Sequence, residues 1–183
     1  MSLPKREFGK TGEQITQLGI GLSEIGSISV QESHEIDRLL NSAIDLGINF
    51  FDTSACYGNS EEFLGRAISH RRSEYFLASK CGHYVESYGD GRGGSSSSVV
   101  KDFDQNKAWT SKTITESVDR SLKRMKTDYL DLIQLHSCDL DMLKEGEVID
   151  AIERIKESSS KAVKGVSIGK NFDTPLDLSL IHI

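Results

Sequence analysis

The chain has 183 residues, of which 37% are hydrophobic, so it can form about one domain with a substantial buried core. Its formal net charge of -6 argues against a surface that binds nucleic acid or an anionic membrane. Three cysteines without paired spacing favour a reducing compartment over a disulfide framework. The N-terminus is charged where a secretory signal would be apolar, and no run is long enough to span a membrane, so we expect a soluble, cytoplasmic protein.

The first half of the chain alternates predicted strands and helices. A hairpin is expected over residues 5–18, because two strand-like segments flank a Lys-Thr-Gly turn that ends at Gly12. Buried strands are then predicted over 18–22, 49–53 and 75–80, with helices over 31–46 and from 59 to about 68. The apolar face of the first helix includes Leu39, and the basic run from His70 to Arg72 is interpreted as a solvated helix end.

A dinucleotide-binding Rossmann motif is not predicted at the first strand. The pattern G-x-G-x-x-G would require glycine at position 24, where Glu24 stands. Residues 82–109 then interrupt the rhythm, because they are rich in Gly and Ser and show no periodicity. We predict a mobile loop insertion over 82–109, with plain disorder as the alternative.

The second half resumes the alternation. Helices are predicted over 111–126 and 145–157, and strands over 129–135 and 162–168. About five β/α repeats of similar length favour an α/β fold of the (β/α)₈ barrel type, incomplete here because such a barrel has eight strands in about 250 residues. We therefore expect one partial barrel domain over residues 1–183, in which 177–183 is interpreted as a non-native tail of a truncated gene.

Four chemically suited side chains follow the predicted strands. Asp52 and Tyr57 come after the second strand, Lys80 ends the third, and His136 ends the fourth. In a barrel, such positions converge at one end, where ligands bind. A phenol can protonate the alkoxide formed by hydride reduction of a carbonyl, provided that a lysine ammonium held by an aspartate stabilises the phenolate. A histidine donor can orient the carbonyl oxygen.

These residues lie in segments that resemble the aldo-keto reductase family, in its bacterial-type branch. The matching signatures, in chain order, are REFGKTG (6–12), GINFFDTSACYGNSEEFLG (47–65), ASK (78–80), DLIQLH (131–136) and KGVS (164–167). The resemblance covers nearly the whole chain, to about residue 170. It implies that Tyr57 is the general acid/base, that Lys80 and Asp52 tune it, and that His136 orients the carbonyl group.

The resemblance also implies the cofactor and the substrate. Family members bind NADP(H), or less often NAD(H), across the barrel mouth and reduce aldehydes or ketones to alcohols. Gly21, Leu22, Ser23 and Asp52 would approach the nicotinamide end, and Ser167 would bind its carboxamide. Many relatives have asparagine after that serine, where Ile168 stands here. The family's pyrophosphate and adenine contacts follow strands seven and eight, so we expect the 183 residues alone to bind cofactor weakly or not at all.

Two other interpretations stay open. One is a non-catalytic, regulatory member of the same fold. The other is a redox or metal protein, since Cys56, Cys81 and Cys138 also lie at strand ends. Their spacing matches no zinc pattern, and Cys81 should point away from the face that carries Lys80, so no metal site is predicted. The oligomeric state is not predicted.

Overall fold

The computed structural model describes residues 3–9, 11–29, 33–83, 108–136, 138, 140–144, 147–157, 162–163 and 166–169. Most of the predicted loop at 82–109, and all of the predicted tail at 177–183, lie outside these ranges. Within them, no helix has the length and apolar character needed to cross a membrane.

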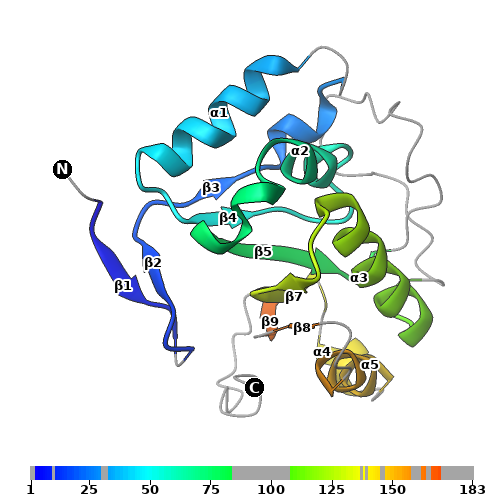
Figure 1. Ribbon diagram of the computed structural model, residues 1–183. Coiled ribbons are helices and arrows are strands. Elements are labelled where there is room, and N and C mark those ends of the chain that lie inside the picture. Colours follow the sequence, from blue (N-terminus) through cyan, green and yellow to red (C-terminus); the bar gives the residue numbers. More distant parts are fainter. Residues whose placement is uncertain are drawn as a thin grey trace.

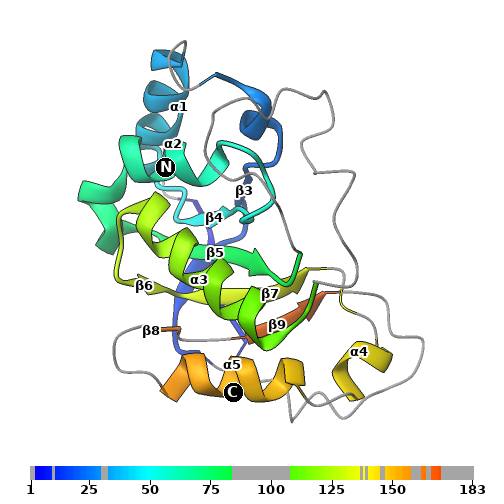
Figure 2. The ribbon, with the colours of Figure 1, turned by 90° about the vertical axis from the view of Figure 1, so that its right-hand side faces the viewer.

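Five parallel strands form the main sheet and stand in the order in which they occur along the chain. They are β3 (Ile20–Gly21), β4 (Phe50–Asp52), β5 (Phe76–Cys81), β7 (Leu132–His136) and β9 (Val166–Gly169). The helices that lie between them in sequence are α1 (His34–Asp45), α2 (Ser60–Ala67), α3 (Ser111–Met125) and α5 (Glu147–Glu157). These helices lie along one side of the sheet (Figures 1 and 2). This arrangement confirms the predicted α/β class and the incomplete (β/α)₈ wall.

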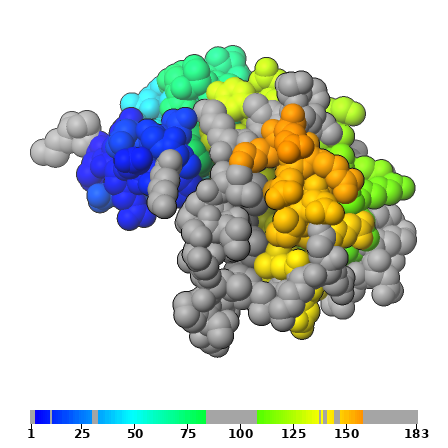
Figure 3. Space-filling view, turned by 90° about the horizontal axis from the view of Figure 1, so that it is seen from below, coloured from blue at the N-terminus to red at the C-terminus, as the bar shows by residue number. Residues whose placement is uncertain are grey.

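The remaining elements are short. Two small sheets pair β1 (Lys5–Glu7) with β2 (Gln14–Thr16), and β6 (Tyr129–Leu130) with β8 (Ala162–Val163). Short helices are η1 (Glu24–Ser27), η3 (Ser69–Glu74) and α4 (Leu140–Lys144). The β1–β2 pair is the predicted hairpin, and it projects at one end of the molecule, away from α5 (Figure 3).

The two faces of the sheet have different partners, as the alternation of side chains along a strand requires. The outer face, with Phe51, Leu77, Ile133 and Leu135, packs beneath the helices in the larger hydrophobic core. We call the opposite side the inner face. At the beginning of its strands it is apolar and is covered by the hairpin, through Ile15, Phe8, Phe50, Phe76, Ala78 and Leu132.

The inner face becomes polar toward the ends of the same strands. Its side chains, strand by strand, are Phe50 and Asp52, then Phe76, Ala78 and Lys80, then Leu132, Gln134 and His136. Because the strands are parallel and in register, the polar members gather at one end. The hairpin therefore covers the inner face where the strands begin, and polar side chains occupy the inner face where the strands end.

A buried ion pair ties η3 to the strand region. The Nη2 atom of Arg72 lies 2.7 Å from Oδ2 of Asp131, and the same oxygen accepts a hydrogen bond from the Leu77 amide at 2.8 Å. The guanidinium also lies over the rings of Tyr75 and Tyr129, at 5.1 and 3.8 Å from their centroids. The prediction that Arg72 is solvated is wrong, because its charge finds a partner 59 positions away in sequence.

Three further predictions need correction. The first strand is limited to Ile20–Gly21, and Leu18 is 57% exposed instead of buried. Leu39 is 49% exposed, because the buried stripe of α1 runs through its neighbours at Ile36, Leu40, Ala43 and Ile44. The predicted strand at 129–135 is divided at Asp131 into β6 and β7, which pair with different strands.

Candidate active site

The four predicted catalytic side chains form one cluster. Lys80, near the end of β5, donates from Nζ to Oδ2 of Asp52 at 2.5 Å and to the Thr53 carbonyl at 2.8 Å. The same Nζ lies 4.8 Å from the centroid of the Tyr57 ring. The ring of His136, at the end of β7, meets the Tyr57 ring edge-on at a centroid distance of 5.6 Å. Three strand ends thus deliver a carboxylate, an ammonium, a phenol and an imidazole to one place.

Two glycines allow the loop that carries Tyr57 to pack against η1. A Cβ atom on Gly26 would collide with the Tyr57 carbonyl, and one on Gly58 would collide with the Gly26 carbonyl. Gly58 also has a φ of +47°, which a side chain would strain. The Asn59 amide donates to the Gly26 carbonyl at 2.9 Å and closes the contact. The position of Tyr57 is therefore set by backbone packing.

Asp52 has a second partner that was not among the predicted site residues. Nε2 of Gln134 donates to Oδ1 of Asp52 at 2.8 Å, so that both carboxylate oxygens are engaged. Gln134 pairs with Lys80 in the strand register. The alternation of a strand places Gln134 on the same face as His136, two residues later. That period of two was the signal that could have identified Gln134.

His136 is held by groups that sequence analysis did not connect with it. Its Nδ1 lies 3.2 Å from the Ser54 hydroxyl and 3.2 Å from the Cys56 sulfur. Its ring stacks on that of His83, with centroids 4.2 Å apart and planes 17° apart, and Trp109 meets His83 edge-on at 5.4 Å. The rings of His83, His136 and Trp109 thus form an aromatic wall beside Tyr57.

Both imidazoles in this wall are neutral near pH 7. Burial, with added effects of His83 and Lys80, lowers the pKa of His136 from 6.5 to about 3. Burial also lowers the pKa of His83. A neutral imidazole has one N–H donor and one acceptor nitrogen, so His136 can accept at Nδ1 and donate at Nε2.

None of the three cysteines forms a disulfide, and all three are buried. Burial raises the pKa of Cys56 to about 11 and that of Cys81 to about 12, so neither is a thiolate at pH 7. This protonation state argues against a cysteine nucleophile. Cys81 lies in the core between sheet and helices, on the face opposite Lys80, as predicted.

The residues expected to meet the nicotinamide lie beside Asp52. Gly21 pairs with Asp52 in the sheet, and the Leu22 amide donates to the Asp52 carbonyl at 2.9 Å. Gly21 is exposed, and no atom lies within 4 Å of the place where its Cβ would be. Together with the neighbouring Ser23, this open backbone fits the approach of a flat ring. Ser167 lies in β9 opposite Gln134, but its side chain is outside the described part of the chain.

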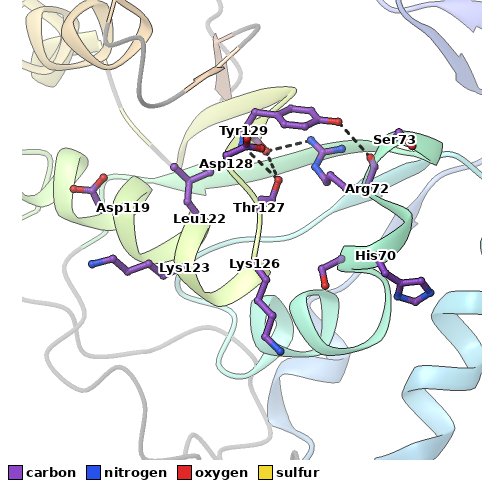
Figure 4. Close-up of a pocket in the computed structure, with 11 residues that line it drawn as sticks. His70, Arg72, Ser73, Asp119, Leu122, Lys123, Lys126, Thr127, Asp128 and Tyr129 are labelled. Carbon is purple, nitrogen blue, oxygen red and sulfur yellow. Dashed lines mark hydrogen bonds between the residues drawn. The ribbon is translucent and has the colours of Figure 1, made fainter.

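An open cleft of about 890 Å³ lies elsewhere, where η3 and the end of α3 meet β6 (Figure 4). None of the four catalytic candidates lines it. Its lysines, Lys123 and Lys126, are accompanied by Asp119 and Asp128, so it has no strong charge of one sign. Arg72 at its wall is already paired with Asp131. The cleft therefore offers no chemistry comparable to that of the strand ends.

Comparison with known proteins gives consistent matches. Residues 17–172 match the model of the Aldo/keto reductase family. L-galactose dehydrogenase of Arabidopsis thaliana is 31% identical, over 94% of this chain and 49% of that protein. The uncharacterized oxidoreductase YqkF of Bacillus subtilis is 35% identical, over 89% of this chain and 48% of that protein. The holo form of the aldo-keto reductase AKR11C1 from Bacillus halodurans superposes with a TM-score of 0.72 at 28% identity, covering 91% of this chain and 50% of that one.

These matches confirm the family resemblance that the signatures indicated and the (β/α)₈ fold class. They also confirm the broader expectation of an oxidoreductase family. The chain spans about half the length of the curated relatives that it matches.

Proposed function

The chain belongs to the aldo/keto reductase family, and from this premise we propose that it carries the proton-transfer groups of an NADP(H)-dependent carbonyl reductase. The substrates would be aldehydes or ketones, which are reduced to alcohols. The observation that carries the proposal is the cluster of Tyr57, Lys80, Asp52 and His136 at neighbouring strand ends. The choice of NADP(H) over NAD(H) rests on the family resemblance.

The cofactor would lie against the open end of β3. Gly21, Leu22, Ser23 and Asp52 would hold the nicotinamide end, and Ser167 would complete the set from β9. When bound, the cofactor supplies the hydride that reduces the carbonyl carbon.

The residues of the cluster have different roles at the carbonyl oxygen of the substrate. Tyr57 donates its hydroxyl proton to that oxygen as negative charge develops there. The Lys80 ammonium, at 4.8 Å from the ring centroid, stabilises the phenolate that remains. Asp52 keeps Lys80 in place and is itself fixed by Gln134. The site therefore holds the positive charge in position before the proton moves.

His136 would orient the substrate. We assign the Ser54 hydroxyl or the Cys56 thiol as the donor to its Nδ1, and this assignment places the ring proton on Nε2. Nε2–H can then donate a hydrogen bond to the carbonyl oxygen. Because His136 is neutral, this hydrogen bond requires no proton uptake from solvent.

The test is the substitution Tyr57→Phe, with Tyr75→Phe as the matched control, both made in a chain of the full length of its relatives, because the 183 residues alone are expected to bind cofactor weakly or not at all. Tyr75 is a buried tyrosine on the outer side of the sheet, and its hydroxyl lies 3.4 Å from the Ile68 carbonyl. Turnover is followed by the loss of NADPH absorbance with an aromatic aldehyde, and NADH is compared in the same assay. We expect kcat to fall by about 10²-fold or more for Tyr57→Phe, and far less for Tyr75→Phe. Equal rates for the two variants would refute the role of Tyr57.

The regulatory alternative has a distinct signature. Saturable binding of NADPH without reduction of any carbonyl compound by the wild type would favour a cofactor-binding role. A cytoplasmic location is also proposed, and the three cysteines, none of which forms a disulfide, support it.

A further inference from the structure

Three potential metal ligands meet beside the proposed catalytic cluster. They are Cys56 in the loop after β4, His83 just after β5, and His136 at the end of β7. One ligand atom from each lies within 4.8 Å of the other two. Cys56 and His83 are buried, and His136 is partly buried. Because the three residues come from separate strand ends, their sequence spacing matches no zinc motif, although the fold brings them together.

The donor set selects the class of ion. One thiolate and two imidazoles suit a borderline-soft divalent ion such as Zn²⁺, whereas Mg²⁺ and Ca²⁺ require oxygen ligands. Zinc bonds of 2.3 Å to sulfur and 2.0–2.1 Å to nitrogen imply separations of about 3.4–3.6 Å between the ligands of a tetrahedral ion. The Cys56 sulfur and His136 Nδ1 are already 3.2 Å apart. We propose that Cys56, His83 and His136 form a zinc-class binding site that has one coordination position left for water.

Binding requires two local changes. The thiol of Cys56 loses its proton to solvent as the sulfur–metal bond forms, so that one proton is released for each ion bound. The rings of His83 and His136 are stacked at 17°, and a metal ion lies in the plane of each imidazole that coordinates it. The His83 ring must therefore rotate out of the stack to direct a nitrogen at the ion. Gly82, which precedes His83, has a φ of +108°.

An ion in this site would inhibit the enzyme. This consequence rests on the proposed function. An ion on Nδ1 would leave the Nε2–H donor intact, but it would draw the His136 ring toward the metal and so move that donor away from the position assigned to the substrate carbonyl. It would also replace the hydrogen bond between the Ser54 hydroxyl and Nδ1, which helps to hold the ring in position. The site would thus couple carbonyl reduction to the availability of zinc.

Titration with Co²⁺ tests the site without reference to activity. In the wild-type chain we expect one equivalent to produce the charge-transfer absorption of a cobalt–thiolate bond, with the visible bands of a tetrahedral ion. Cys56→Ser should abolish the thiolate band, and His83→Gln should weaken Co²⁺ affinity at least tenfold. Cys81→Ala is the matched control, because Cys81 is another buried free thiol but faces the helices. Circular dichroism confirms that each variant is folded.

The outcomes separate this proposal from the proposed function. Absence of a thiolate band in the wild type, its survival in Cys56→Ser, or its loss in Cys81→Ala would overturn the metal site. Tyr57→Phe should retain the band, whatever its effect on turnover. Zn²⁺ should displace Co²⁺ and inhibit the wild type, EDTA should restore its activity, and His83→Gln should require at least tenfold more Zn²⁺ for the same fractional inhibition. Inhibition that is equally strong in His83→Gln would refute the link between this site and activity.

Discussion

The buried ion pair between Arg72 and Asp131 allows a test of how burial determines the contribution of an ion pair to the free energy of unfolding. The substitution Asp131→Ala leaves the Arg72 guanidinium without its carboxylate, at 9% exposure, and leaves the Leu77 amide without its acceptor. Breaking a buried pair by removing one partner costs about 3–5 kcal/mol. A lost acceptor for a buried amide has a cost of about 1–3 kcal/mol, and the two losses overlap because one oxygen serves both donors. We expect a decrease of about 4 kcal/mol in the free energy of unfolding, which is a large part of the roughly 5–15 kcal/mol available to a domain.

The matched control is Asp45→Ala. Asp45 accepts from Arg71 at 2.7 Å, the same distance as in the buried pair, but its side chain is 66% exposed. Water screens this pair, so its loss should cost only a small fraction of the loss at Asp131. Urea unfolding, followed by circular dichroism, measures both variants. With a slope of about 2 kcal/mol per molar urea, Asp131→Ala should shift the midpoint by about 2 M. Equal shifts for the two variants would refute the argument from burial.

Three further predictions concern packing, the site and pH. Gly65→Ala should destabilise the fold by about 2 kcal/mol or more, because the new Cβ would collide with the Arg124 carbonyl; an unchanged melting temperature would contradict this close approach of α2 and α3. Gln134→Leu removes the 2.8 Å hydrogen bond to Asp52 and should lower kcat/KM about tenfold, with little change in circular dichroism; wild-type kinetics would show that Lys80 holds Asp52 alone. The folded-state pKa of His136 is about 3, below the ordinary 6.5, so the unfolded chain binds the proton first and stability falls as the pH decreases from 6.5 toward 3. His136→Gln should reduce the dependence of stability on pH. The reduction is at most about 1.4 kcal/mol per pH unit, and it should be smaller because the ring is partly exposed. Urea unfolding at several pH values measures it, and an unchanged dependence would contradict the role of His136.

The strand ends could be predicted because buried parallel strands have a distinctive sequence pattern. Apolar runs before Asp52, Lys80 and His136 placed all three at the same edge of the sheet, and the structure brings them together there. The resemblance to the reductase family added roles for these residues, but their proximity followed from the pattern alone.

What could not be predicted depends on contacts between distant segments. Arg72 was placed in solvent because the basic run around it has the composition of an exposed helix end, and nothing near it in sequence indicates Asp131. His83, which stacks on His136, lies at the start of segment 82–109, and this segment has no periodicity in its sequence from which the contact could be predicted. Gln134 is different, since its position two residues before His136 already placed it on the inner face.

Hydrogen bonds from Lys80 and Gln134 to Asp52 link three adjacent strands: Lys80 lies opposite Gln134 in the sheet, and Asp52 lies opposite Ala78, two residues before Lys80. A slip of β5 by one residue would turn Lys80 toward the helices and bring the thiol of Cys81 to the inner face. A slip by two residues would keep the correct face but place Ala78 or Gly82 opposite Gln134 in place of Lys80. Turnover by this site would therefore report the alignment of three strands, and a loss of activity in a well-folded variant could reveal a misaligned strand that global measures of secondary structure would miss.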